Sequence, residues 1–163
     1  MNRIAKFFKV SPELYFEAKK EECSREYEQI KLPQRATTGS AGYDFFAPFD
    51  FCLAAGEGIK IPTGIRVRIN EGWALLIYPR SSLGFKYRLQ LDNSVGIIDS
   101  DYYYSDNEGH IFIKLTNDSR DGKELCVKAG EAFAQGIFMP YGLCEDDAAD
   151  GVRNGGFGST NKN

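Results

Sequence analysis

The stretch GIRVRINEGWALLIYP, residues 64–79, joins two hydrophobic patterns through a short polar turn. In the first part Ile65, Val67 and Ile69 alternate with arginines. This period of two is typical of a strand with one buried face. From Trp73 the apolar run is more continuous, and we interpret it as a second strand. The stretch therefore predicts two consecutive β-strands.

A similar pattern of short strand-like segments extends over most of the chain. From Ile30 onward, short β-rich segments are punctuated by Gly, Pro, Asn and Asp. HIFIKLTN (110–117) again alternates, and KELCVKAGEAFAQGIFMP (123–140) predicts two strands around a Lys-Ala-Gly-Glu turn. Short strands at this spacing predict an all-β sandwich or barrel.

The two ends of the chain have a different character. Residues 11–29 predict a helical stretch, with Ser11 as N-cap and a proline at the first helical position. Its apolar stripe is weak, so we expect an extension lying on the surface. The tail from Glu145 is acidic and then Gly-rich, and we expect it to add nothing to the core. We divide the chain into an extension (1–29), a core (30–144) and an arm (145–163).

Composition excludes several classes of protein. Hydrophobic residues make up 42% and charged residues 26% of the 163 residues, as in ordinary globular proteins. The net charge of −3 gives no reason to expect nucleic-acid binding. No apolar run approaches the roughly 20 residues of a membrane helix, and the first residues do not resemble a signal peptide. We therefore expect a cytoplasmic protein that binds neither nucleic acid nor membrane.

The cysteines predict no metal centre. Cys23, Cys52, Cys126 and Cys144 are widely spaced, and His110 is the single histidine. This arrangement argues against a zinc site. We expect all four cysteines to be reduced structural thiols.

YPRSSLGFK (78–86) could bind an anion. Arg80, Ser81 and Ser82 offer one cation and two hydroxyls before Gly84. Such groups at the start of a short helix suit phosphate. An ordinary turn with an arginine salt bridge explains the residues equally well. In GSAGYDFFAP (39–48), Asp44 alone is better explained as a cap at a strand entry.

LDNSVGIIDSDYYY (91–104) places a carboxylate and aromatic rings after an apolar strand. Asn93 and Gly96 flank a turn whose backbone could face a planar ligand. Asp99 is ionised at neutral pH and suits a general base acting on water. The three tyrosines (102–104) could stack on a base or sugar. An Asx-turn and cross-strand packing are the structural alternatives.

RNGGFGSTN (153–161) resembles a phosphate loop, but no helix can follow it, so it is not a Walker-type site. We interpret it as a mobile arm that closes over a ligand. Phe157 would cover a flat ring, while Arg153 and Ser159 reach phosphates. A disordered tail is the alternative.

Five segments between Ile30 and Asn161, taken in order, resemble the five motifs of the trimeric dUTPases (deoxyuridine triphosphate nucleotidohydrolases). These segments are AGYDFFAP, PRSSLG, NSVGIIDSDY, GEAFAQ and RNGGFGST. The resemblance implies a jelly-roll-like subunit and a homotrimer with active sites between subunits. It also implies hydrolysis of dUTP to dUMP and pyrophosphate with Mg²⁺ as cofactor.

The resemblance also implies roles for individual residues. Asp99 matches the aspartate that activates the attacking water, and Tyr102 the tyrosine that packs on deoxyribose and disfavours a 2′-hydroxyl. Asn93 and Gly96 fall in the hairpin that reads uracil. Asp44 matches the aspartate that orients the waters of the metal.

The remaining matches concern the phosphates and the lid. Those expected to contact phosphates from the core are Arg80, Ser81, Ser82, Gly84 and Gln135. Phe157 matches the aromatic lid over uracil. Its neighbours in the arm, expected to bind the substrate with it, are Arg153, Gly158, Ser159 and Thr160.

The chain departs from the family pattern at several points. Ala132 or Phe133 stands where a basic residue is usual, and a longer loop, YYSDNE (103–108), follows Tyr102. One residue separates Arg153 from Gly155, a shorter spacer than in some members, and Asn161 stands where glycine is frequent. Two alternatives stay open. One is a dCTP deaminase of the same fold, and the other is a non-catalytic regulatory protein that responds to dUTP.

Overall fold

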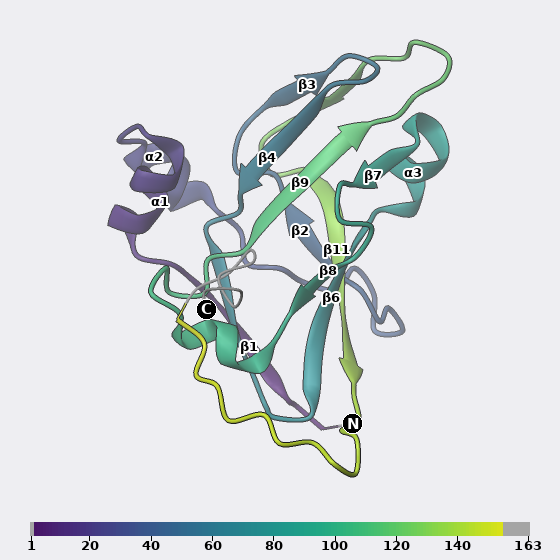
Figure 1. The fold of residues 1–163 in the computed structure, drawn as a ribbon. Helices are drawn as coiled ribbons and strands as arrows, with labels where there is room; N and C mark the ends of the chain where they lie inside the picture. Colours follow the sequence, from purple (N-terminus) through teal and green to yellow (C-terminus); the bar gives the residue numbers. More distant parts are fainter. Residues whose placement is uncertain (1, 155–163) are drawn as a thin grey trace.

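In the computed structural model of this chain, residues 2–154 are described, and residues 1 and 155–163 are not. The described part is dominated by short strands, with a few short helices at the N-terminal end and between strands (Figure 1). The strands are β1 (Ala5–Lys9), β2 (Tyr43–Phe46), β3 (Phe51–Leu53), β4 (Gly58–Pro62), β5 (Ile65–Ile69), β6 (Trp73–Pro79), β7 (Leu89–Leu91), β8 (Gly96–Ile98), β9 (Phe112–Asn117), β10 (Leu125–Val127) and β11 (Ala132–Pro140). The helices are α1 (Pro12–Lys19), α2 (Ser24–Gln29), α3 (Ser81–Tyr87) and a 3₁₀ helix, η1 (Ser100–Tyr104). None of these helices is long and apolar enough to cross a membrane.

The strands pair in four antiparallel groups, in the orders β2-β11-β6-β8, β4-β9-β7, β1-β5 and β10-β3. Many of these neighbours are distant in the sequence, so the chain crosses over between strands instead of pairing each strand with the next. The expected all-β, jelly-roll-like class is confirmed.

The core follows the hydrophobic alternation of the sequence. Ile65, Val67 and Ile69 on β5 are at most 6% exposed, as the opening stretch predicts. Ile113 and Leu115 on β9 are buried in the same cluster, and β10 and β11 flank the predicted turn. Burial of each large aliphatic side chain stabilises the fold by roughly 1.5–3 kcal/mol.

The N-terminal segment is more than the single helical stretch expected for residues 11–29. Two helices form there, separated at Lys20, whose φ of 58° is left-handed and ends α1. Before them β1 pairs with β5 along its whole length, a strand that the sequence reading missed. Tyr15 of α1 is fully buried. Leu14, Phe16 and Tyr27 also pack against the core, so this segment contributes more to the core than its weak apolar stripe indicated.

The expectation of four reduced thiols is wrong for two of them. Cys52 on β3 and Cys126 on β10 form a disulfide, while Cys23 and Cys144 are free. The antiparallel register of the two strands places Cys52 directly opposite Cys126. Pairing of strands 74 residues apart creates this contact, and the spacing of the cysteines carries no sign of it.

Candidate active site

Asp44, Arg80 and Gln135 meet at a cavity of about 540 Å³ next to the β2 edge of the four-stranded sheet. We call it the Arg80 cavity. It is lined by Ala36, Ser40, Ala41, Gly42, Asp44, Arg80, Ser81, Ser82, Gln135 and Ile137. The sheet register explains the meeting, because Gln135 on β11 lies opposite Asp44 on β2 and Tyr78 on β6.

Charge in the Arg80 cavity is organised by one ion pair. The Arg80 Nε lies 3.2 Å from an Asp44 carboxylate oxygen, and its Nη1 donates to the Ala132 carbonyl at 3.4 Å. Gln135 donates from Nε2 to the Pro79 carbonyl at 3.1 Å. A Cβ at Gly42 would lie 2.9 Å from the Gln135 side-chain oxygen, so the glycine makes room for the glutamine.

The helix expected after Arg80 is present. α3 begins at Ser81, with Arg80 in extended conformation before it. The first turn of a helix has N–H groups without intrahelical acceptors, and the exposed serines Ser81 and Ser82 carry hydroxyls beside them. Gly84 lies within the same helix but does not line the cavity.

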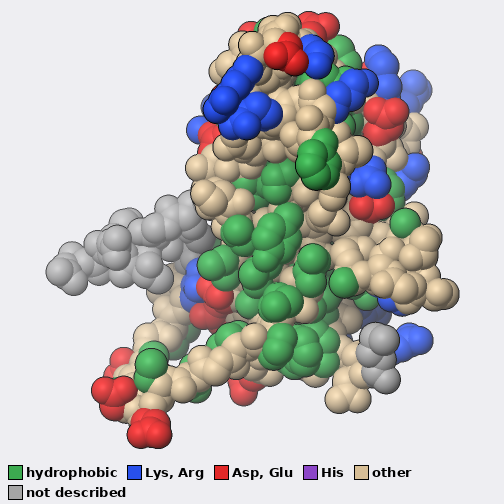
Figure 2. All heavy atoms as spheres, turned by 90° about the vertical axis from the view of Figure 1, so that its right-hand side faces the viewer, with side chains coloured by type: hydrophobic (Ala, Val, Ile, Leu, Met, Phe, Trp, Pro, Cys, Tyr) green, Lys and Arg blue, Asp and Glu red, His purple; other side chains and the backbone are tan. Residues whose placement is uncertain are grey.

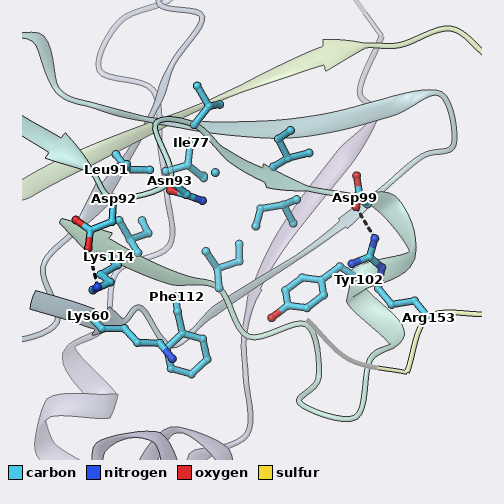
Figure 3. A pocket seen from close by; sticks show the side chains of 16 residues that line it. Lys60, Ile77, Leu91, Asp92, Asn93, Asp99, Tyr102, Phe112, Lys114 and Arg153 are labelled. Carbon is cyan, nitrogen blue, oxygen red and sulfur yellow. Dashed lines mark hydrogen bonds and ion pairs between the residues drawn. The ribbon is translucent and has the colours of Figure 1, made fainter. Parts of the chain in front are cut away.

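Asn93, Gly96, Asp99, Tyr102 and Arg153 line a second cavity, of about 620 Å³, which we call the Tyr102 cavity. Its other lining residues are Lys60, Ile77, Leu91, Asp92, Val95, Ile97, Ile98, Ile111, Phe112, Ile113 and Lys114. Figure 3 shows Tyr102, Asp99 and Arg153 at one end, and Asp92 with Lys114 at the other. Most of the wall is apolar, with charged groups at both ends, which suits a flat, partly polar ligand.

Asp99 follows β8 directly and begins η1 in extended conformation, with φ −78° and ψ 158°. One carboxylate oxygen accepts from the Arg153 Nη2 at 2.5 Å. The same guanidinium donates from Nε to Asp101 at 2.8 Å. The strand end fixes where the carboxylate emerges, and the arm supplies its counter-charge (Figure 3).

The three tyrosines have three different environments. Tyr102 is 5% exposed and lines the cavity. Tyr103 packs on the Phe8 ring and under the Arg66 guanidinium, whereas Tyr104 is 74% exposed. Of the three, only Tyr102 is placed for stacking on a ligand in the described structure, and Tyr103 has the structural packing role. Burial raises the pKa of Tyr102, against smaller opposite effects of Asn107 and Arg153, so its hydroxyl stays a donor at neutral pH.

The turn between β7 and β8 forms one wall of the Tyr102 cavity. It stands where the family resemblance implied a hairpin, but β7 pairs with β9 and β8 with β6. Asn93 lies in this exposed turn, beside Ser94 with a φ of 63°. Gly96 pairs with Ile77 of β6, and a Cβ there would lie 3.1 Å from the Ile77 Cβ. Gly96 is therefore needed for close approach of β8 to β6, a packing reason that adds to the expected access to its backbone.

The two cavities lie at opposite edges of one sheet. Asp44 belongs to β2 and Gly96 to β8, the two outer strands in the order β2-β11-β6-β8. With strands about 4.8 Å apart, this places them roughly 14 Å from each other. Within the described residues the cavities share no lining residue. The candidate site residues of one chain therefore form two separate groups.

Four candidates, Phe157, Gly158, Ser159 and Thr160, lie outside the described residues. The sequence reading missed the cavity residues Lys60, Phe112 and Lys114. Lys60 and Lys114 are direct partners on β4 and β9, so they lie on one face of that sheet, and only the strand pairing brings them together. It also missed Asn107, whose amide bonds the Tyr102 hydroxyl.

Comparison with known proteins assigns the chain to a family. The dUTPase family model matches residues 28–161. The chain belongs to the dUTPase family. Among dUTPase relatives, the deoxyuridine 5′-triphosphate nucleotidohydrolase of Lactococcus lactis is 43% identical over 134 residues, which is 80% of this chain and 88% of the relative. That of Pectobacterium carotovorum is 39% identical over 143 residues, 83% of this chain and 90% of the relative.

Solved dUTPase structures agree with this assignment. The dUTPase of Streptococcus mutans is 33% identical, with a TM-score of 0.65, and covers 88% of this chain and 99% of its own. A mutant dUTPase of the Staphylococcus aureus phage phi11, described with a structural Mg(II) ion, is 20% identical, with a TM-score of 0.66 over 91% of this chain and 98% of its own. The phage protein supports the dUTPase fold alone.

Proposed function

We propose that the protein hydrolyses dUTP to dUMP and pyrophosphate, with Asp99 as the base. The observation that carries this proposal is the placement of Asp99 and Tyr102 at one end of an apolar cavity, in a chain of the dUTPase family. The division into extension, core and arm, and a cytoplasmic location, remain part of this proposal.

The chemistry at Asp99 is proton removal from water. The water oxygen forms a bond to the α-phosphorus, and the bond from that phosphorus to the oxygen bridging to the β-phosphate breaks. The carboxylate takes one proton of the water, and pyrophosphate leaves. A positioned base contributes roughly 10²–10⁴-fold. Arg153, which pairs with Asp99, would leave the carboxylate free for the water by turning to the phosphates.

The Tyr102 cavity suits the nucleoside. The apolar wall with the turn at Asn93 and Gly96 would receive uracil, and the Tyr102 ring would lie against the deoxyribose. Backbone groups complementary to uracil would be left unpaired by cytosine, and such unpaired buried groups reject a wrong base by roughly 10⁴-fold.

The Arg80 cavity suits the phosphates. Arg80, the hydroxyls of Ser81 and Ser82 and the Gln135 amide supply donors, with Gly84 in the helix that carries the serines. Arg80 also donates to the carbonyl of Ala132, next to the position where a basic residue is usual in the family. Arg153, Gly158, Ser159 and Thr160 of the arm would add phosphate contacts, and Phe157 a lid.

Magnesium fits this site through water. Mg²⁺ prefers oxygen ligands and keeps several waters. The Arg80 cavity offers one carboxylate, Asp44, already paired with Arg80, so Asp44 would hold the ion through its waters. When bound, the ion neutralises charge on the triphosphate.

A homotrimer would join the two cavities. Since the groups lie at opposite edges of a sheet, a complete site needs the Arg80 cavity of one subunit to face the Tyr102 cavity of another. One face of the molecule carries a gathering of hydrophobic side chains (Figure 2), and exposed apolar patches mark association surfaces. Sedimentation showing a fully active monomer would contradict the shared site.

The test is pyrophosphate release with Mg²⁺ from dUTP, UTP, dCTP and dTTP. We expect strong preference for dUTP. Ammonia released from dCTP would show a deaminase, and dUTP binding without release of pyrophosphate would show a regulatory protein.

A further inference from the structure

The loop 103–108, longer than the family pattern, holds Tyr102 by its hydroxyl together with His110, which follows the loop. That hydroxyl donates to the His110 carbonyl at 2.7 Å and accepts from the Asn107 Nδ2 at 2.9 Å. Both partners of the hydroxyl thus belong to the protein itself. Tyr102 lines the cavity, and its hydroxyl serves to fix the angle of the ring.

Asn107 is itself held in place. Its side-chain oxygen accepts from the Gly109 N–H at 3.1 Å, and its carbonyl accepts from the His110 N–H at 3.0 Å. Gly109 has a φ of 70°, and a Cβ there would lie 2.7 Å from the Tyr102 carbonyl oxygen. The loop thus packs directly on the backbone of the tyrosine that it orients.

The N-terminal segment supports the loop from outside. The Ser11 N–H donates to a Glu108 carboxylate oxygen at 2.9 Å, and Arg66 Nη1 lies 3.5 Å from the same oxygen. Arg66 also donates from Nη2 to the Tyr103 carbonyl at 2.7 Å. We call Ser11, Arg66, Glu108 and the Tyr103 ring the brace.

We propose that Asn107, supported by the brace, is a positioning residue that fixes the Tyr102 ring and so sets the preference for 2′-deoxyribonucleotides over ribonucleotides. The inference rests on the proposed function. A ring fixed at its far end cannot tilt to admit an extra hydroxyl, whereas a ring without the Asn107 bond has one restraint fewer. Exclusion by shape of one small group is worth roughly 10–200-fold, so partial loss is measurable.

The experiment compares kcat/KM for dUTP and for UTP in the full-length protein. Asn107→Ala is expected to raise the ratio of UTP to dUTP by about tenfold, a tenfold change being about 1.4 kcal/mol. Asn70→Ala, at an exposed position on the turn after β5, is the matched control and should leave the ratio unchanged. A general loss of stability lowers both rates together, so the ratio separates positioning from folding.

The outcomes are distinct. If the wild type does not hydrolyse dUTP, the proposed function fails and this inference fails with it. If the wild type hydrolyses dUTP and Asn107→Ala is folded with an unchanged ratio, only the inference is overturned.

If circular dichroism shows that Asn107→Ala is unfolded, the variant Glu108→Gln decides. This variant keeps an acceptor for Ser11 but loses the charge facing Arg66, and a rise of about two- to threefold is expected. An unchanged ratio in Glu108→Gln would then overturn the inference.

Discussion

The Arg80 cavity and the Tyr102 cavity are built in different ways. In the first, Asp44 and Gln135 are brought together by strand register alone. In the second, the ring of Tyr102 is placed by hydrogen bonds of its hydroxyl to Asn107 and His110, and the N-terminal segment supports the neighbouring Glu108. Strand register is maintained by many backbone bonds, whereas a side-chain clamp depends on one or two atoms. Substitution outside the ligand surface should therefore disturb the Tyr102 cavity more readily.

The largest expected effect on activity comes from substitution of Asp99, the proposed base in the Tyr102 cavity. Asp99→Asn keeps the shape of the side chain but removes the base, so pyrophosphate release from dUTP should fall by roughly 10²–10⁴-fold. Single-turnover rates with Mg²⁺ measure this. Asp101→Asn is the matched control, because Asp101 also contacts Arg153 but has no role as base. A fall of the same size in both variants would assign the effect to Arg153 instead.

A smaller effect is expected in the Arg80 cavity. Arg80→Gln removes the cation and leaves Asp44 without its ion pair. Hydrogen bonds to charged groups contribute roughly 1.5–3 kcal/mol, so kcat/KM for dUTP should fall about tenfold to a hundredfold. The ratio of UTP to dUTP should stay as in the wild type, because Tyr102, the proposed sugar contact, lines the other cavity. Arg68→Gln, on the exposed face of β5, serves as control. A changed ratio of UTP to dUTP in Arg80→Gln would contradict the proposed separation of phosphate and sugar binding between the two cavities.

The smallest effect concerns stability in acid. Burial lowers the pKa of His110 to about 4, with Glu108 acting weakly in the opposite direction and Lys60 adding to the lowering. The unfolded chain takes up a proton below about pH 6.5, while the folded histidine stays neutral to about pH 4. The unfolded state thus binds more protons in this window, and stability falls as pH drops through it. From pH 7.5 to 5 the loss from this group is about 2 kcal/mol.

Urea unfolding at pH 7.5 and pH 5 measures the loss. His110→Gln is the comparison variant, since glutamine does not titrate and can still accept from the Gly64 N–H, which now bonds the His110 Nε2 at 2.9 Å. Between pH 7.5 and pH 5 the free energy of unfolding of His110→Gln should fall by about 2 kcal/mol less than that of the wild type. Equal pH dependence of variant and wild type would contradict a neutral buried histidine.

Local pattern was enough to predict most strands. Alternation identified β5, and the turn at residues 128–131 separated β10 from β11. The same reasoning failed for β1, because AKFFK has no alternation and its partner lies on β5, which only the fold brings near. It failed for Cys52 and Cys126 for the same reason.

The candidate site divides along similar lines. Arg80 and Gln135 were expected to contact phosphates and Asp44 to orient the waters of the metal, and the three residues line one cavity. Asn93, Gly96, Asp99 and Tyr102 share the other cavity. Asn107 could not be found, because an asparagine in a polar loop is an ordinary turn residue. Its role depends on the direction of one amide toward one hydroxyl.

The bond between Ser11 and Glu108 spans 97 residues, and this has a consequence for synthesis of the protein. At roughly 5–20 residues per second, Ser11 is made about 5–20 s before its partner. β1 meets β5 earlier, so the N-terminal segment is expected to dock first on β5 and to await the loop. Chains interrupted before residue 108 would then carry a docked N-terminus and an unformed Tyr102 cavity.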